Sequence, residues 1–357
     1  MLPSSEAAIA ALPAATPVEE KDTVSVAFVA AALARLTEPA RARALAAAGI
    51  QAELLRTPQA RVTADAFAAL WLAAARELDD EFFGLDARRM KSGSFKLLCR
   101  SLLPARDLGQ GLRRVLQGFN CLLDDVGGEL LQRGDEAVVT LHNRVAEPEA
   151  HRFAAETFLV LVHGLMCWLA GRRIPLRWAR FDYPRPAHAR EYAAMYSPES
   201  AFEAAETAIA FDAALLAVPV AQDERSLKAF LAAAPRSVFL KYRNEEGMAA
   251  RVRRRLKPCV ESGAEWPQFE TVAAELHLSA NTLRRRLAAE GASYQGIKDT
   301  LRRDAAIHLL TGSRLSVEAI AARLGYEDAS AFHRAFRKWL NTQPGEYRMR
   351  AAPPPST

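Results

Sequence analysis

The chain of 357 residues is half apolar, has a formal net charge of +5 and contains four cysteines. Its length is sufficient for two domains of ordinary size. The cysteines lie far apart without a CxxC pair, which argues against a disulfide framework and a cysteine zinc site and favours a reducing cytoplasm. Abundant alanine and only 8% aromatic residues favour helix over strand.

The positive charge is concentrated in the last third of the chain. Residues 241–350 hold 20 Lys and Arg against 13 Asp and Glu, a net charge of +7, whereas the remainder carries −2. A basic segment behind a near-neutral one indicates a nucleic-acid-binding module joined to another domain. A solvated basic surface would give the same count.

The first half of the chain is predicted to be mainly helical. Residues 1–20 contain three prolines and lack a positively charged start, so they are predicted to be a disordered tail and not a signal peptide. Apolar residues with helical spacing predict helices at 26–36, 64–78 and 95–126. The last of these is broken near Pro104 and resumes after Asp107, a suitable helix cap.

Strand patterns follow in the next hundred residues. Residues 128–143 predict two strands around a turn at Arg133, Gly134 and Asp135. The apolar run at 158–171 predicts a buried helix, too short to span a bilayer. Further strands are predicted at 174–186 and through Ile209 and Phe211, the latter followed by a short helix closed by Pro219. Mixed helices and strands predict an α+β domain over residues 21–222, with no membrane segment.

No strand pattern occurs after Asp223. Linker helices are predicted at residues 223–246, an all-α domain at 247–350 and a disordered tail at 351–357. The predicted fold is therefore an α+β N-terminal domain followed by an all-α domain.

A duplicated unit lies in the basic third. Segments 270–291 and 318–339 match at an offset of 48, which becomes 49 after one extra turn residue. Each copy reads as a short helix, a tight polar turn and a second helix, the order of a helix-turn-helix unit. Ser279 and Asp328 precede the second helices, where a side-chain oxygen caps free backbone N–H groups.

Helical spacing assigns the faces of these second helices. Leu283 and Leu287 in the first copy, and Phe332, Phe336 and Trp339 in the second, are predicted to face inward. The outward residues are then Asn281, Arg284 and Arg285 in the first copy and Ala329, Ser330, His333, Arg334 and Arg337 in the second.

Such faces suit double-stranded DNA. An α-helix fits the major groove, where Arg binds guanine and Asn binds adenine. Phosphate contacts are predicted from further basic residues: Arg286, Arg302, Arg303, Arg337 and Lys338. The alternative is a helical bundle with a solvated basic face. Two matching copies argue against it, because the helix between them has one apolar stripe that would make it a rigid connector. That stripe consists of Tyr294, Ile297, Leu301, Ala305 and Leu309.

At these residues the sequence resembles the AraC/XylS family of bacterial transcription regulators. The resemblance covers residues 247–348 and is specific in "LGYEDASAFHRAFRKWLNTQPGEYR", residues 324–348. It implies two helix-turn-helix units in adjacent major grooves. It places base contacts on Asn281, Arg284 and Arg285 in the first reading helix and on Ala329, Ser330, Ala331 and Arg334 in the second. Where many relatives have larger polar side chains, this chain has Ala329 and Ala331, so Arg334 is expected to do most of the reading there.

Residues 24–220 are similar, less distinctively, to the arabinose-binding-type sensor domain found in a subset of this family. The resemblance implies a cytoplasmic regulator controlled by a small organic effector, acting as an activator or alternatively as a repressor. As a hypothesis, the effector shifts an equilibrium in dimerisation, giving a homodimer, or in domain placement, which changes DNA occupancy or contact with RNA polymerase. The sequence identifies neither the effector nor the residues that bind it.

Other functional classes are less well supported by the sequence. His163 and Cys167 have the spacing of two metal or haem ligands, but apolar neighbours favour a core helix. No catalytic motif is present, so no enzyme, cofactor or metal site is predicted. The alternatives are a DNA-alkylation repair enzyme fused to an AraC-type unit and a nonspecific architectural DNA-binding protein. The first lacks the required Pro-Cys-His-Arg setting, because Val260 and Glu261 follow Cys259, and the second would not need a sensor-sized front domain.

Overall fold

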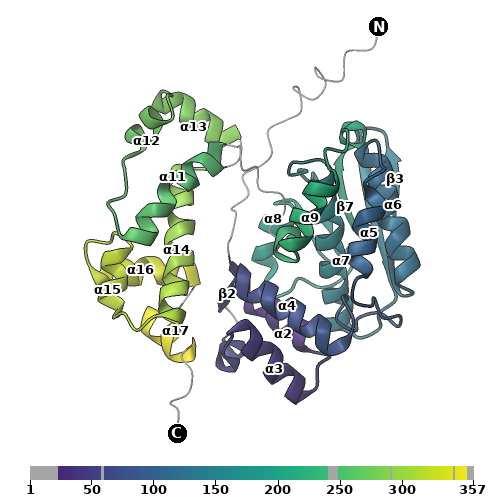
Figure 1. Cartoon of the computed structure of the whole chain (residues 1–357), viewed down its shortest axis with the longest axis horizontal. Coiled ribbons are helices and arrows are strands. Elements are labelled where there is room, and N and C mark those ends of the chain that lie inside the picture. Colours follow the sequence, from purple (N-terminus) through teal and green to yellow (C-terminus); the bar gives the residue numbers. More distant parts are fainter. Residues whose placement is uncertain (1–22, 58–59, 240–247, 290–291, 341, 352–357) are drawn as a thin grey trace.

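The chain folds into an α+β front domain and an all-helical back domain (Figure 1). The computed structural model describes residues 23–57, 60–239, 248–289, 292–340 and 342–351. We call residues 23–239 the front domain and residues 248–351 the back domain. This order confirms the predicted fold class. The predicted tail at 1–20, and all but the first residue of the one predicted at 351–357, lie outside the described residues.

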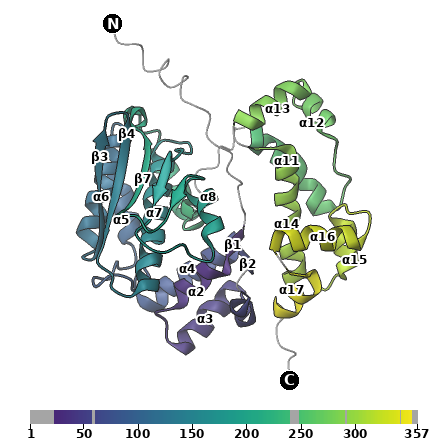
Figure 2. The same ribbon diagram turned by 180° about the vertical axis from the view of Figure 1, so that it is seen from behind.

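A five-stranded sheet forms one side of the front domain (Figure 2). Its order is β3-β4-β7-β5-β6, antiparallel except for the β5–β6 pair. The strands are β3 (Val126–Arg133), β4 (Glu136–Asn143), β5 (Trp178–Arg180), β6 (Ser200–Ala201) and β7 (Thr207–Asp212). The predicted hairpin and the strand through Ile209 are confirmed. The strand predicted at 174–186 shrinks to β5, because the prolines that flank it cannot donate ladder hydrogen bonds.

Helices form the rest of the front domain, and several of them have the predicted ends. They are α2 (Val26–Leu33), α3 (Glu38–Ala48), η1 (Ala52–Arg56, a 3-10 helix), α4 (Ala64–Leu78), α5 (Ser94–Leu102), α6 (Leu108–Leu122), α7 (Pro148–Leu169), η2 (Ala189–Glu191), α8 (Tyr192–Met195), η3 (Ala213–Ala217), α9 (Glu224–Ala232) and α10 (Arg236–Phe239). Asp107 caps α6 as predicted, since its carboxylate accepts the Gln110 N–H at 2.7 Å. The break near Pro104 separates α5 from α6.

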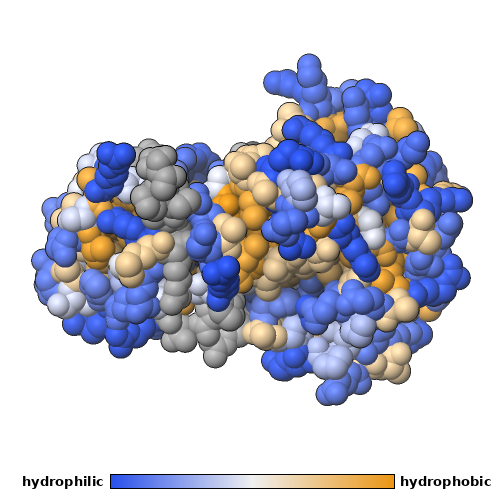
Figure 3. Space-filling model, turned by 90° about the horizontal axis from the view of Figure 1, so that it is seen from below, coloured by the Kyte–Doolittle hydropathy of each residue, from blue (hydrophilic) through white to orange (hydrophobic). Residues whose placement is uncertain are grey.

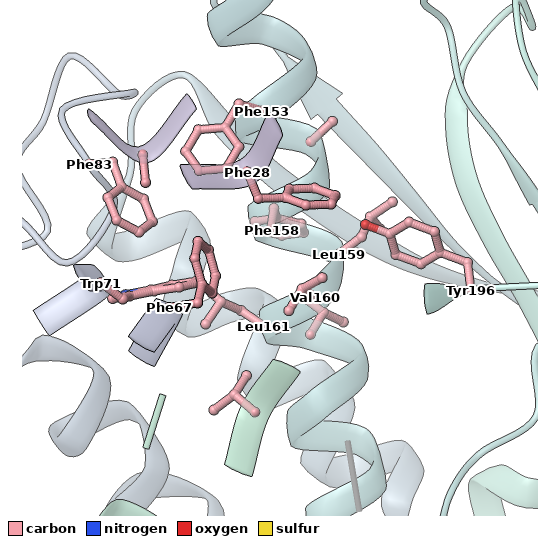
Figure 4. Packing of buried hydrophobic residues seen from close by; sticks show 14 of the residues in the cluster. Phe28, Phe67, Trp71, Phe83, Phe153, Phe158, Leu159, Val160, Leu161 and Tyr196 are labelled. Atoms are coloured by element: carbon pink, nitrogen blue, oxygen red, sulfur yellow. The ribbon is translucent and has the colours of Figure 1, made fainter. Parts of the chain in front are cut away.

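Helix α7 runs through the core of the front domain. It has 22 residues, eight more than the run at 158–171, and is long and apolar enough to cross a bilayer by length and composition alone. However, 94% of its apolar window is buried inside the protein. Phe153 and Phe158 of α7 lie among aromatic rings from α2 and α4 (Figure 4). The helix therefore has the surroundings of a core helix.

A short ribbon of two strands was not predicted. β1 (Thr23–Ser25) pairs with β2 (Arg61–Thr63) in antiparallel register, with Val24 opposite Val62. Each strand has three residues, too few for an alternating pattern to be recognised in the sequence. The ribbon lies at the edge of the front domain that faces the back domain (Figure 1).

The predicted linker helices α9 and α10 pack on the front domain. The Phe230 ring of α9 stacks on Trp168 of α7 with centroids 4.8 Å apart, and Phe239 of α10 meets Phe67 of α4 at 5.3 Å. The predicted linker thus begins as part of the front domain. Residues 240–247 lie outside the described residues.

The back domain is helical throughout its described part. Its helices are α11 (Met248–Ser262), α12 (Phe269–Glu275), α13 (Ala280–Ala289), α14 (Tyr294–Gly312), α15 (Val317–Arg323), α16 (Ala329–Leu340) and α17 (Pro344–Ala351). Figure 1 shows α12 and α13 at one end of α14 and α15 and α16 at the other. The predicted stripe of α14 divides between two cores: Ile297 and Leu301 pack with the first unit, and Ala305 and Leu309 with the second. One helix therefore joins the two units by packing into both.

The domains meet where β2 and η1 of the front domain contact α14 and α17 of the back domain. Both ribbon views place the β1–β2 ribbon beside these helices (Figures 1 and 2). Viewed from below, the outer surfaces of the two lobes are mostly hydrophilic, and apolar residues gather toward the middle (Figure 3). Among the described residues, the two helices predicted to read DNA, α13 and α16, make no extensive contact with the front domain.

Candidate nucleic-acid interface

Helices α13 and α16 begin at side-chain caps. The Ser279 hydroxyl accepts the Thr282 N–H at 3.1 Å, and the Asp328 carboxylate accepts the Ala331 N–H at 2.6 Å. Both predicted caps are confirmed. Because each cap satisfies an N–H group that has no partner within the helix, it fixes where that helix starts and which residues its first turn presents.

The inward faces are those that helical spacing predicted. Leu283 and Leu287 are at most 1% exposed, and Phe332 and Phe336 are fully buried. Trp339 is half-buried and contacts the Phe336 ring at 6.5 Å between centroids. Burial of these side chains leaves the polar and basic residues of both helices on the outside.

In the first unit, the predicted reading residues Asn281, Arg284 and Arg285 are all exposed, as is Arg286. The Arg284 guanidinium lies over the Phe269 ring at 5.3 Å, a cation–π contact that orients it. Four adjacent exposed polar or basic residues give this helix a face suited to an anionic partner.

In the second unit, Ser330, Arg334, Arg337 and Lys338 are exposed, whereas Ala329 and Ala331 are partly buried. His333 is also partly buried, and its Nδ1 lies 2.8 Å from the side-chain amide of Gln343 in the segment before α17. This contact fixes the imidazole on one side. Arg334 thus remains the long exposed side chain among the predicted reading residues of α16.

Two predicted phosphate ligands are used inside the back domain instead. The Arg302 Nε donates to the Leu324 carbonyl at 3.0 Å, and its guanidinium lies 4.8 Å from the centroids of both the Trp266 and Tyr326 rings. Arg303 is 8% exposed, and its Nη2 lies 3.1 Å from the Asp304 carboxylate. These positions do not agree with a phosphate role. Charge counting in the sequence does not separate basic residues that pack from those that face solvent.

Trp266 braces the second helix-turn-helix unit against the segment before the first, a contact that the sequence did not predict. Its indole N–H donates to the Leu324 carbonyl at 3.0 Å. The next residue, Gly325, has φ +74°, and a Cβ there would lie 2.6 Å from the Trp266 ring. Glycine is required on both grounds, conformation and space. The glycine in the turn of the second copy was the only sign of this contact in the sequence. Trp266, 59 residues earlier, belongs to no recognisable motif.

The front domain uses the residues weighed as metal ligands for packing. His163 is buried, with its Nε2 2.8 Å from the Ile174 carbonyl, and the Cys167 Sγ accepts the Ile174 N–H at 3.3 Å. Both side chains therefore hold the turn after α7. Among the described residues, no group of three or more His, Cys, Asp or Glu side chains is arranged to hold a metal ion.

A buried polar cluster in the front domain was missed by sequence reasoning. Glu156 of α7 is 2% exposed; its carboxylate lies 2.7 Å from His188 Nε2 and accepts the Tyr192 hydroxyl. Tyr196 donates to the Glu156 carbonyl at 3.1 Å, and the Tyr183 and Tyr192 hydroxyls are 3.1 Å apart. Burial, and secondly the Glu156 charge, raise the pKa of Tyr192 well above its usual value, which keeps this phenol a hydrogen-bond donor.

Known proteins resemble the chain over both domains. The family model described as "Arabinose-binding domain of AraC transcription regulator, N-term" matches residues 40–220, and a "Helix-turn-helix domain" model matches residues 272–350. The chain is 30% identical over 305 residues to the ornithine utilization regulator of Pseudomonas aeruginosa, covering 85% of this chain and 88% of that protein. It is 27% identical to an uncharacterized HTH-type transcriptional regulator of Mycobacterium tuberculosis, covering 86% of this chain and 90% of the other.

Solved structures give a weaker likeness. The crystal structure of the transcriptional regulator CdpR from Pseudomonas aeruginosa is 26% identical, covers 72% of this chain and 82% of its own, and has a TM-score of 0.29. At that TM-score the overlay carries no argument. The sequence relatives and family models therefore carry the comparison.

Proposed function

Because this chain belongs to the AraC family of transcription regulators, with an N-terminal ligand-binding domain and a C-terminal helix-turn-helix DNA-binding domain, we propose that it binds one promoter sequence through α13 and α16 together. The observation that carries this proposal is the pair of capped helices with exposed Arg285 and Arg334, each of which shares a hydrophobic core with the same connector, α14. A fixed connector allows the two helices to enter successive major-groove faces, which lie roughly 34 Å apart.

The proposed contacts divide into two kinds. Base reading is assigned to Asn281, Arg284 and Arg285 of α13 and to Ser330 and Arg334 of α16, with Ala329 and Ala331 offering apolar contact to thymine methyl groups. Phosphate contact is assigned to Arg286, Arg337 and Lys338. Arg302 and Arg303 are left out because they pack inside the back domain, and His333 because Gln343 holds its ring.

The ligand-binding domain is proposed to control DNA binding in response to a small organic effector. In this proposal the regulator acts in the cytoplasm as a homodimer and contacts RNA polymerase as an activator. The name of one relative refers to ornithine utilization, which makes small amines and amino acids sensible first effectors to test. Neither a repair enzyme nor an architectural protein is favoured by any specific feature of the described residues.

The direct test is selection of bound fragments from the source genome by the purified full-length protein. The proposal expects a few fragments that share one sequence pattern, bound much more tightly than random DNA of the same length. Equal binding to all fragments would contradict sequence-specific regulation and support the architectural alternative. Genes beside the selected fragments would then suggest the effector.

Lys338→Ala tests the phosphate role. Lys338 is exposed in the last turn of α16 and is expected to neutralise a phosphate without reading a base. We expect weaker binding to all DNA sequences alike, with the slope of log affinity against log salt reduced by about one. The measurement is a titration of specific and random duplexes at several salt concentrations. A loss confined to the specific duplex would count against the phosphate role.

A further inference from the structure

Arg61 of β2 is a buried residue that contacts three separate parts of the chain. It is 7% exposed, and its guanidinium donates to Thr23 of β1, at 2.8 Å from Nε to the hydroxyl and 2.6 Å from Nη2 to the carbonyl. The same guanidinium binds both carboxylate oxygens of Glu191, at 2.5 and 3.0 Å. Its backbone carbonyl accepts the hydroxyl of Tyr347 from α17. Arg61 therefore joins the ribbon, the η2–α8 segment and the back domain.

On the front-domain side, residues 188–196 are held to the core by the buried cluster described above. His188 and Tyr192, which flank Glu191, both bind the Glu156 carboxylate. The His188 ring also meets Phe28 of α2, with centroids 4.9 Å apart. The position of the Glu191 carboxylate is thus determined by a polar group deep within the ligand-binding domain. A shift of this cluster would move the partner of Arg61.

On the back-domain side, the contact continues to a reading helix. Tyr347 is 1% exposed, and its ring lies 5.5 Å from that of Phe336, which belongs to the core beneath α16. On α14, which contacts α17, Asp304 is largely buried and pairs with Arg303. Burial raises the pKa of Asp304, and the charges of Arg303, Arg61 and Arg253 oppose that rise. The junction between the domains therefore contacts both the connector α14 and, through Tyr347, the core beneath α16.

We propose that Arg61 is a positioning residue that couples the ligand-binding domain to the reading helices. In the docked state, Glu191 holds the Arg61 guanidinium while the Arg61 carbonyl holds Tyr347. Displacement of residues 188–196 loosens Arg61, and with it the docking of α17. This inference rests on the proposed function, since it describes how the state of the ligand-binding domain reaches the DNA-binding face. The two states differ in a small number of hydrogen bonds, so a modest binding energy is enough to shift the balance between them.

The test is amide hydrogen exchange of the full-length protein, with Glu191→Gln as the main variant. It keeps the size of the side chain and removes the charge that binds Arg61. We expect amide exchange in α17 to become roughly two- to twelvefold faster, which is the range that the loss of one hydrogen bond corresponds to. Glu199→Gln is the matched control: this exposed carboxylate lies in the same part of the front domain, and its loss should leave α17 unchanged.

Tyr347→Phe approaches the same coupling from the other domain. It removes the hydroxyl that binds the Arg61 carbonyl and keeps the ring that packs on Phe336. Amide exchange in β2 and in residues 188–196 should become faster. Because both substitutions break the same coupling, the variant that combines them should exchange only slightly faster than the more affected single variant. Unchanged exchange across the junction in both variants would overturn the proposal. If Glu191→Gln also speeds amide exchange in α7, it disturbs the core of the front domain. The result for Tyr347→Phe alone then decides the test. Because no DNA is used, failure here is distinct from failure of the proposed DNA binding.

Discussion

Arg334→Ala and Arg285→Ala will each weaken binding to the specific site by about 1–3 kcal/mol, or about 5- to 150-fold. Each will have a smaller effect on binding to random DNA. Both arginines are exposed on helices whose starts are fixed by caps, so we expect their guanidinium groups to reach base edges without a change in the backbone. A bidentate contact to guanine carries sequence information that a phosphate contact lacks. Titration of the selected fragment and a scrambled duplex at one salt concentration measures both effects.

A control for these substitutions is Arg133→Ala. Arg133 is exposed at the end of β3 in the front domain, so the variant loses the same charge away from both reading helices. It should bind the two duplexes nearly as the parent does. If the Arg285 and Arg334 variants also bind the specific fragment like the parent, the assignment of these faces is wrong.

Phe336→Ala will lower the free energy of unfolding of the back domain by about 3–5 kcal/mol, the usual cost of removing a buried phenylalanine ring. Phe336 is fully buried, and its ring centroid lies 5.6 Å from that of Phe332 and 5.5 Å from that of Tyr347. The cavity would lie beneath α16 and beside α17. Urea-dependent amide hydrogen exchange in α15, α16 and α17 measures the change, because it reports on the back domain separately from the three tryptophans of the front domain that would contribute to a fluorescence signal.

Met349→Ala provides the comparison for that loss. Met349 lies on α17, which contacts α16, but it is 73% exposed, so its truncation should change the unfolding free energy by no more than about 0.5 kcal/mol. Similar midpoints for the Phe336 and Met349 variants would show that the ring does not support the unit as described.

Local patterns predicted much of the architecture. The helical spacing of apolar residues and the capping residues located α4, α6, α13 and α16. A helix that buries one face must repeat apolar residues about every 3.6 positions. The hairpin of β3 and β4 was visible because eight residues on each side of a glycine-containing turn are enough for strand preference to show. The duplication then supplied the order of the back domain without knowledge of any tertiary contact.

Interactions between distant segments were beyond such patterns. Arg302 and Arg303 were counted with the surface bases, yet Trp266 and Tyr326 enclose one and Asp304 pairs with the other. The spacing of apolar residues along one helix does not show which residues of other segments its side chains will contact. The Glu156 cluster was missed for the same reason, because its members come from α7 and from residues about 30 to 40 positions later. Only folding brings them together.

The division of the α14 stripe between two cores has a consequence for the sites that the protein can occupy. Inserting a single residue in the middle of this helix would turn one unit by about 100° and move it by about 1.5 Å relative to the other. In the proposed binding mode, the pitch of the duplex would then no longer match the separation of the two units. If both units read DNA as proposed, the allowed gap between the two halves of the recognised sequence is set by the number of residues in one helix.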